Sequence, residues 1–231
     1  MFTGHLAVGF AAKRIEPKIS LGTWMLAAML ADLLLFPLLI AGVERVTLQP
    51  GVTTNRVVGV NIAYSHSLLM DVLWGVLFAL AYYLYQRYFR GAWLLFAAVL
   101  SHWVLDVVSH RPDMPIAPGV STTIGLGLWN SIPATLAVEG GLWLIALILY
   151  VRFTPLVTRV RRIVFWIAVV FLTFAWYGNI KGGMDPNPVR AGVGGLIFFS
   201  LMVVWAYWID HRRPAYSGLS GSGSDIAAAS A

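Results

Sequence analysis

Residues Leu100–Asp113 (LSHWVLDVVSHRPD) decide how the rest of the chain is interpreted. They end an apolar run that begins at Ala92, and they place His102, Asp106 and His110 four residues apart. Residues four apart lie on one face of a helix, and the eighth drifts by only about a quarter-turn. The stretch therefore predicts a helix that presents three metal-ligating groups from one side.

The composition places this helix in a membrane. Of the 231 residues, 59% are hydrophobic and 11% are charged, whereas soluble domains carry roughly 25% charged residues. The absence of cysteine excludes disulfides and thiolate zinc ligands. The net charge of +6 comes from basic residues in short loops between apolar runs, so it indicates membrane topology and no nucleic-acid binding.

The hydropathy pattern predicts an all-α, polytopic transmembrane bundle of about six spans. A short helix over residues 3–14 precedes them and reaches only part-way across the bilayer. The expected spans are Leu21–Val43 with a kink at Pro37, Ala63–Tyr85, Ala92–His110, Ile132–Val151, Ile163–Tyr177 and Ala191–Ile209. Residues 1–216 are expected to form one integral membrane domain.

The chain ends and the loops indicate an orientation. Eleven of the sixteen Lys and Arg residues fall on the side that holds both termini, so the positive-inside rule predicts an inner-membrane protein with cytoplasmic termini. Loops are expected at 44–60, 111–131 and 181–190. The segment 217–231 is rich in Ser, Gly and Ala and is expected to be a disordered tail.

Ionisable side chains recur at similar depths in these spans. At about 1.5 Å per helical residue, Asp32, His102 and Glu139 lie roughly 18 to 20 Å from the basic residues that flank their spans. The sequence offers no Lys or Arg at that depth to pair with the acids. A buried unpaired carboxylate costs several kcal/mol or becomes protonated. Four acids near several histidines therefore predict one or two divalent metal ions, with zinc well suited to His and carboxylate ligands.

The candidate site residues fall into groups by expected role. The metal ligands are His5, Asp32, His66, His102 and Asp106, with His110 as the next candidate. Glu139 or Asp71 is expected to act as the general base. The loop residues Arg111, Asp113 and Arg190 are expected to contact substrate. Ser65, Ser67, Ser101 and Ser109 flank the histidines and are expected to hydrogen-bond them.

Several of these residues also have an ordinary structural explanation. The polar face of the Leu100–Asp113 helix can hydrogen-bond other helices. His66 lies near a span end and can be an interfacial residue, and His5 can be exposed near the chain start. Glu139 precedes two glycines and can serve helix packing.

Four short elements, taken in order, carry a family resemblance. They are Gly4-His5, Ala31-Asp32-Leu33-Leu34, Ser65-His66-Ser67-Leu68, and Ser101-His102 followed by Asp106. Together they resemble a family of bacterial and archaeal inner-membrane proteins described as membrane-bound metal-dependent hydrolases. The resemblance covers roughly the first half of the chain. The sequence departs from the family at Leu34, where a second Asp is usual, and at Asn61-Ile62-Ala63, where His-Arg-Gly is common.

The resemblance and the buried polar set predict a membrane-embedded metal-dependent hydrolase. Its substrate would be a membrane lipid or lipid-linked ester or phosphoester, cleaved by a metal-activated water. Two other classes stay open. A proton- or metal-ion-coupled transporter also carries ionisable residues in its spans, although no inverted repeat is evident. A non-catalytic membrane protein can use a metal to hold its bundle together.

Overall fold

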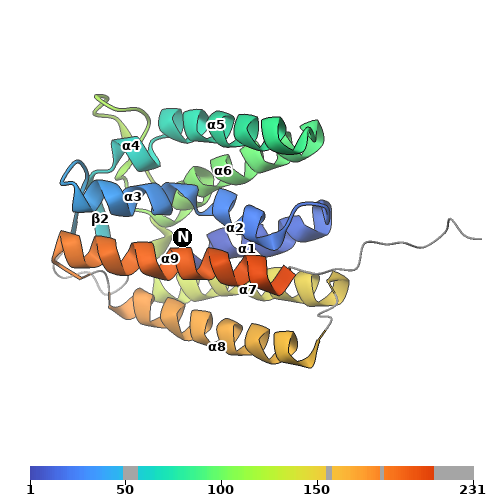
Figure 1. The fold of residues 1–231 in the computed structure, drawn as a ribbon. Coiled ribbons are helices and arrows are strands. Elements are labelled where there is room, and N and C mark those ends of the chain that lie inside the picture. The colour runs from blue at the N-terminus through green and yellow to red at the C-terminus, as the bar shows by residue number, and fades with distance from the viewer. Residues whose placement is uncertain (49–56, 155–157, 183–184, 211–231) are drawn as a thin grey trace, which may run out of the picture.

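The computed structural model describes residues 1–48, 57–154, 158–182 and 185–210. Nearly all regular structure in these ranges is helical (Figure 1), which confirms the predicted all-α bundle. The helices are α1 (Phe2–Ile15), α2 (Leu21–Ala28), α3 (Leu30–Ile40), α4 (Ala63–His66), α5 (Leu68–Gln86), α6 (Phe89–Ser109), α7 (Ile132–Phe153), α8 (Arg159–Lys181) and α9 (Pro188–Asp210), with a 3-10 turn η1 (Leu128–Asn130). The expected disordered tail at 217–231 lies outside the described residues.

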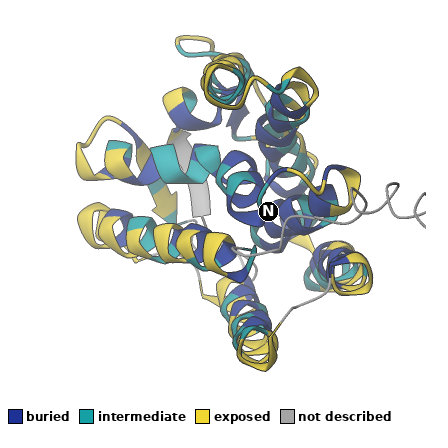
Figure 2. Cartoon of the chain, turned by 45° about the vertical axis from the view of Figure 1, so that its right-hand side comes forward, coloured by how far each residue is buried: buried dark blue, intermediate teal, exposed yellow. Residues whose placement is uncertain are grey.

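Five helices, α5 to α9, are long and apolar enough to cross a membrane, and the pair α2 and α3 gives a sixth crossing if it is one broken span. Exposed positions lie on the outward faces of the peripheral helices (Figure 2). On α5 these exposed positions include Leu69, Leu73, Val76, Leu77, Leu80 and Leu84. Apolar surface in water costs about 25 cal/mol per Å², and acyl chains remove that cost. The outward faces therefore suit a lipid environment.

The first predicted span is a broken pair of helices. Helices α2 and α3 meet at an angle of 56°, and the break lies at Met29 (φ −116°, ψ 14°). The predicted kink at Pro37 stays a prediction, because Pro37 lies inside α3 and the 56° break lies before this helix begins. The break ends the hydrogen-bond ladder of α2, so its last carbonyls need other partners. One of them, Ala28 O, accepts a hydrogen bond from His102.

Helix α3 is held against α9 by close contact at a glycine. A Cβ atom at Gly192 would lie 2.6 Å from Ile40 and 2.9 Å from the carbonyl oxygen of Phe36. On α3, Phe36 also packs against Phe199, with ring centroids 5.2 Å apart and the rings tilted by 49°. This packing fixes α3 beside α9 and directs its first turn into the bundle.

The second predicted span also divides. Ser67 is extended (φ −86°, ψ 150°) and its Oγ accepts the Met70 N–H at 3.3 Å, so it caps the start of α5. The turn α4 ends immediately before it, at His66. Helix α8 is longer than the predicted Ile163–Tyr177, because Arg159, Arg161 and Arg162 continue the helix beyond the apolar run. At a membrane boundary, a long basic side chain can extend its charged end into water while its stem lies along apolar surface.

Two of the expected loops contain short hairpins. Strand β1 (Arg45–Leu48) pairs antiparallel with β2 (Val57–Asn61), and β3 (Met114–Pro115) pairs with β4 (Thr123–Ile124). Figure 1 shows β2 and α4 at the same end of the bundle. The β3 segment reaches α5 there, because Ile116 O accepts the Leu69 N–H at 3.0 Å. These hairpins hold the ends of α3, α4 and α6 together.

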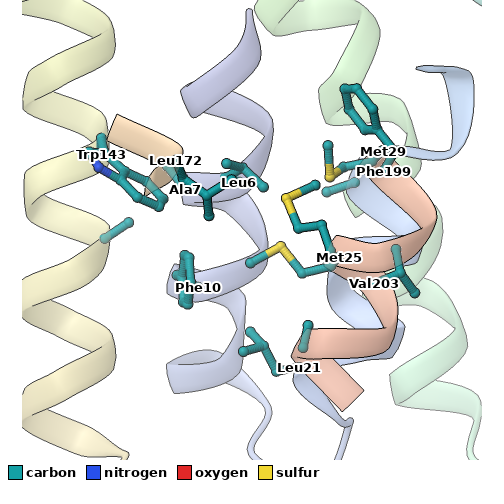
Figure 3. Packing of buried hydrophobic residues seen from close by; sticks show 14 of the residues in the cluster. Leu6, Ala7, Phe10, Leu21, Met25, Met29, Trp143, Leu172, Phe199 and Val203 are labelled. Carbon is teal, nitrogen blue, oxygen red and sulfur yellow. The ribbon is translucent and has the colours of Figure 1, made fainter. Parts of the chain in front are cut away.

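Helix α1 is the centre of the hydrophobic core. Its Phe10 ring lies 5.5 Å from Trp143 and 4.9 Å from Tyr150, both on α7. Figure 3 shows Leu6, Ala7 and Phe10 between Trp143 on one side and Met25 on the other. The start of the chain therefore lies inside the bundle (Figure 1), which places His5 in the interior.

Candidate metal centre

Four helices bring five of the predicted ligands together. His5 comes from α1, Asp32 from the first turn of α3, His66 from the end of α4, and His102 and Asp106 from α6. All are buried except Asp32, whose side chain is 19% exposed. In the described part of the chain, two overlapping sets have ligand atoms within 4.8 Å of one another: His5, Asp32 and His102, and His66, His102 and Asp106.

Four His–Asp contacts in this cluster approach the spacing between the ligands of a metal ion. His102 Nε2 lies 3.2 Å from Asp106 Oδ2 and 4.0 Å from Asp32 Oδ1. His66 Nε2 lies 3.6 Å from Asp32 Oδ1 and 3.9 Å from Asp106 Oδ2. A tetrahedral zinc ion with bonds of about 2.0–2.2 Å keeps its ligand atoms roughly 3.3–3.6 Å apart. Small movements of these side chains would therefore complete such a site.

The orientation of His102 also fits a cation. Its Nδ1 lies 2.8 Å from Ala28 O, and a carbonyl only accepts, so Nδ1 carries the hydrogen. The buried Nε2 makes no hydrogen bond within the described residues, although Asp106 is close. A neutral imidazole in this tautomer points a lone pair toward carboxylate oxygens. A positive ion between these groups removes that repulsion, and a hydrogen-bonded Nδ1 is typical of metal-binding histidines.

The second oxygen of Asp106 faces His5. Asp106 Oδ1 lies 3.1 Å from His5 Nε2 and forms an ion pair with the amino group of Met1. The His5 and His102 rings stack, with centroids 3.7 Å apart and an interplanar angle of 6°. One oxygen of Asp106 therefore faces His66 and His102, and the other faces His5.

His110 lies at the edge of the cluster. Its Nε2 is 3.9 Å from Asp106 Oδ1, and its Nδ1 is 3.0 Å from Asp113 Oδ1. Its ring packs on Trp129, with centroids 4.3 Å apart. The predicted substrate contact Asp113 thus orients His110. Arg111 donates from Nη2 to Trp129 O at 3.2 Å.

The remaining predicted residues belong to neither ligand set. Both oxygens of the buried Glu139 accept hydrogen bonds, from Trp129 Nε1 at 2.8 Å and from Trp176 Nε1 at 3.0 Å. The carboxylate of Asp71 is fully buried on α5 and belongs to neither set. Arg190 is exposed and pairs with Asp185 at 3.1 Å. The structure therefore places Glu139 and Arg190 away from the five ligands, whereas Asp71 lies near enough to His66, His102 and Asp106 to interact with them electrostatically.

Of the four serines next to histidines, Ser65 hydrogen-bonds its neighbour. Its Oγ lies 2.7 Å from His66 Nδ1. Ser67 caps α5, Ser101 donates to Ala98 O at 2.7 Å, and Ser109 donates to Leu105 O at 3.1 Å. The expectation for these three serines is wrong, because a hydroxyl within or before a helix readily bonds local backbone groups.

A cavity of about 290 Å³ adjoins the cluster. Its polar lining includes His5, Asp32, His66, Asp106 and His110, together with Asn179. Its apolar walls come mainly from α3 and α9 and include Leu35, Phe36, Phe198 and Phe199. No Lys or Arg is among the described residues that line it. Arg111, Asp113 and Arg190 also lie outside this lining.

A second polar cluster, at the other end of α1, is structural. The buried Lys13 donates from Nζ to Pro17 O at 2.9 Å, Ile19 O at 2.8 Å and Asp210 Oδ2 at 2.7 Å. Beside it, Tyr88 donates to Glu16 Oε2 at 2.6 Å, and this hydrogen bond holds the pKa of Glu16 below its ordinary value. These contacts join α1 to α9 and to the start of α6.

Sequence reasoning missed Glu44. It lies just beyond the first predicted span and was grouped with a polar loop, yet it is only 1% exposed. It accepts hydrogen bonds from the backbone and side chain of Ser65. The signal that could have found it is an acid placed directly after an apolar run and before a histidine motif.

Comparison of the chain with protein-family models, curated proteins and solved structures finds no match. The resemblance to membrane-bound metal-dependent hydrolases therefore stays a prediction from four short motifs. The spatial convergence of their residues is an independent observation.

Proposed function

We propose that this protein is a membrane-embedded metal-dependent hydrolase that acts on a lipid or lipid-linked ester. One observation carries the proposal: two overlapping sets, each of two imidazoles and one carboxylate, have ligand atoms close enough to hold a metal ion beside a largely apolar cavity. Catalytic metal sites, unlike closed structural ones, keep a position open to water or substrate. A cavity beside the ligands supplies room for such a position.

The metal would be held by Asp32, His66, His102 and Asp106, and zinc or a similar divalent ion suits these donors. Two carboxylates also balance the charge of one divalent ion. When bound, the metal supplies a Lewis acid and a water that is activated near neutral pH. His5 and its stacking on His102 keep the Asp106 carboxylate and the imidazole in place.

His110 is the better candidate for proton transfer within the cavity. A general base needs an accessible ring nitrogen within reach of the substrate or water. His110 lines the cavity, and Asp113 orients it through the opposite ring nitrogen. Glu139, by contrast, has both oxygens engaged by tryptophan N–H groups. We therefore assign the general base role to His110 and an anchoring role to Glu139.

The cavity walls favour an amphiphilic substrate with a neutral scissile bond. Apolar side chains from α3 and α9 suit an acyl or isoprenoid chain. No Lys or Arg is present among the described lining residues to compensate a phosphate, and the Met1 ammonium group that lines the cavity is already paired with Asp106. A carboxylic ester therefore suits the site better than a phosphoester. With the termini in the cytoplasm of a plasma membrane, as the basic residues favour, the site would lie in the outer half of the bilayer.

The test is elemental analysis of the purified protein followed by hydrolysis assays. We expect about one divalent ion per chain, hydrolysis of long-chain p-nitrophenyl esters, and little cleavage of bis(p-nitrophenyl) phosphate. His102→Ala should lose both metal and hydrolysis. Ala175→Trp fills the cavity and should retain metal but lose long-chain hydrolysis. Ala97→Trp, on an exposed face of α6, should retain both metal and hydrolysis.

Three results would argue for another function. Protein that folds without any metal affinity removes the proposed centre altogether. Metal without hydrolysis of any ester favours a structural ion. Metal-ion uptake into proteoliposomes that depends on His102 favours transport.

A further inference from the structure

Glu44 is buried beside the proposed metal centre but belongs to neither set of candidate ligands. It lies in the turn between α3 and β1 and is 1% exposed. We infer that Glu44 is a positioning residue that fixes the metal-binding form of His66 through Ser65. This inference rests on the proposed metal centre.

Two short hydrogen bonds connect Glu44 to His66. Glu44 Oε2 lies 2.5 Å from Ser65 Oγ, and Ser65 Oγ lies 2.7 Å from His66 Nδ1. Ser65 is fully buried and His66 is 4% exposed. The three side chains therefore form a chain of hydrogen bonds that is shielded from solvent.

The direction of this chain follows from the chemistry of its end. An ionised carboxylate only accepts hydrogen bonds, so the Ser65 hydroxyl donates to Glu44. The Ser65 oxygen then accepts the hydrogen of His66 Nδ1. The other ring nitrogen, Nε2, is left with a free lone pair. It faces Asp32 at 3.6 Å and Asp106 at 3.9 Å, which is the orientation that a metal ligand needs.

Glu44 also has a plain structural role, and the two roles use different oxygens. Its Oε1 accepts the backbone N–H groups of Tyr64 at 2.8 Å and Ser65 at 2.9 Å, at the start of α4. Its Oε2 contacts the Ser65 hydroxyl. A substitution that preserves the first oxygen and alters the second can therefore separate capping of α4 from positioning of His66.

Glu44→Gln makes this separation. The amide oxygen can still accept from the two backbone N–H groups, while the amide nitrogen can only donate to Ser65 Oγ. Ser65 must then donate to His66 Nδ1, and the hydrogen of the ring moves to Nε2. A protonated Nε2 cannot bind a metal. Ser65→Ala interrupts the chain by another route and leaves both backbone hydrogen bonds to Glu44 intact.

The experiment compares Glu44→Gln, Ser65→Ala and the control Ser101→Ala, whose hydroxyl bonds its own helix. Zinc affinity is measured by chelator competition, and the thermal midpoint is measured without metal. The nitrogen NMR spectrum of ¹⁵N-histidine-labelled, metal-free protein reports which ring nitrogen of His66 carries hydrogen, with His66→Gln assigning the signal. These readouts distinguish a positioning role from a capping role.

We expect His66 to carry hydrogen on Nδ1 in the natural protein and on Nε2 in Glu44→Gln. Zinc affinity should fall about 10- to 100-fold, as is usual when the partner of a metal ligand is lost, with little change in the metal-free midpoint. Ser65→Ala should also weaken zinc binding, and Ser101→Ala should not.

Two outcomes would overturn the inference. One is an unchanged His66 tautomer with unchanged zinc affinity in both Glu44→Gln and Ser65→Ala. The other is a loss of affinity that only accompanies a fall in the metal-free midpoint. If the natural protein binds no zinc, the proposed function fails, and the tautomer in the metal-free spectrum still decides the role of Glu44.

Discussion

We expect Asp32→Asn to separate the proposed metal binding from folding. The carboxylate of Asp32 faces the Nε2 atoms of His66 and His102 at 3.6 and 4.0 Å, and these nitrogens have lone pairs in the tautomers that their hydrogen bonds select. Asparagine has nearly the same shape, lacks the charge, and can donate to one of these nitrogens. The metal-free protein should therefore be as stable as the natural protein or more so, whereas zinc binding should weaken sharply.

The size of the effect follows from the four proposed ligands. Structural zinc sites with four ligands bind with about 10–16 kcal/mol, so one ligand contributes roughly 2.5–4 kcal/mol, or about 70- to 900-fold in affinity. At a zinc concentration of 100 times its dissociation constant, a protein gains about 2.7 kcal/mol of stability, and a site weakened 100-fold gains only about 0.4 kcal/mol. For a chain of this size the difference is roughly 5–9 °C in the zinc-dependent shift of the thermal midpoint.

The assay is a thermal melt in detergent, with chelator and with zinc, together with metal analysis. Asp185→Asn makes the same chemical change at an exposed position that pairs with Arg190, and its zinc-dependent shift should match that of the natural protein. The reasoning is refuted if Asp32→Asn keeps the full zinc-dependent shift. It is equally refuted if the metal-free midpoint falls by several degrees, because Asp32 would then be a structural hydrogen-bonding residue.

Three further predictions concern residues outside the ligand set. Glu139→Gln places an amide NH₂ against tryptophan N–H groups and should cost about 1–3 kcal/mol of stability. Its metal content should be unchanged. Normal stability with lost hydrolysis would instead indicate that Glu139 acts as the general base. Lys13→Met removes the cation that pairs with the buried Asp210 carboxylate and should lower the free energy of unfolding by about 3–5 kcal/mol in denaturant. Adding Asp210→Asn should recover most of this stability. No recovery would mean that Lys13 stabilises the fold through its other contacts. The lowered pKa of Glu16 means that it stabilises the fold above its ordinary pKa of 4.5 and loses this contribution as the pH falls further. Tyr88→Phe should reduce this acid-side loss in thermal melts between about pH 3 and 6, and an unchanged pH profile would exclude the Tyr88 hydrogen bond as its source.

The helical architecture was predictable because it depends on local composition. A run of about 20 apolar residues must satisfy its own backbone hydrogen bonds in lipid, and a helix does so within one segment. The boundaries were less predictable. The break at Met29 and the division at Ser67 have no hydropathy signal, since they serve contacts with residues far along the chain.

The sequence by itself determined the all-α class and the identity of the candidate ligands. His5, Asp32, His66, His102 and Asp106 are acids and histidines within apolar surroundings, and burial makes such residues rare unless they have partners. The tertiary structure alone decided which atoms meet. It orients the His102 ring through a carbonyl group left free by the break between α2 and α3. It orients the His66 ring through Ser65 and Glu44. The physical reason is that depth along separate helices is readable from spacing, whereas rotation and hydrogen-bond direction depend on how those helices pack.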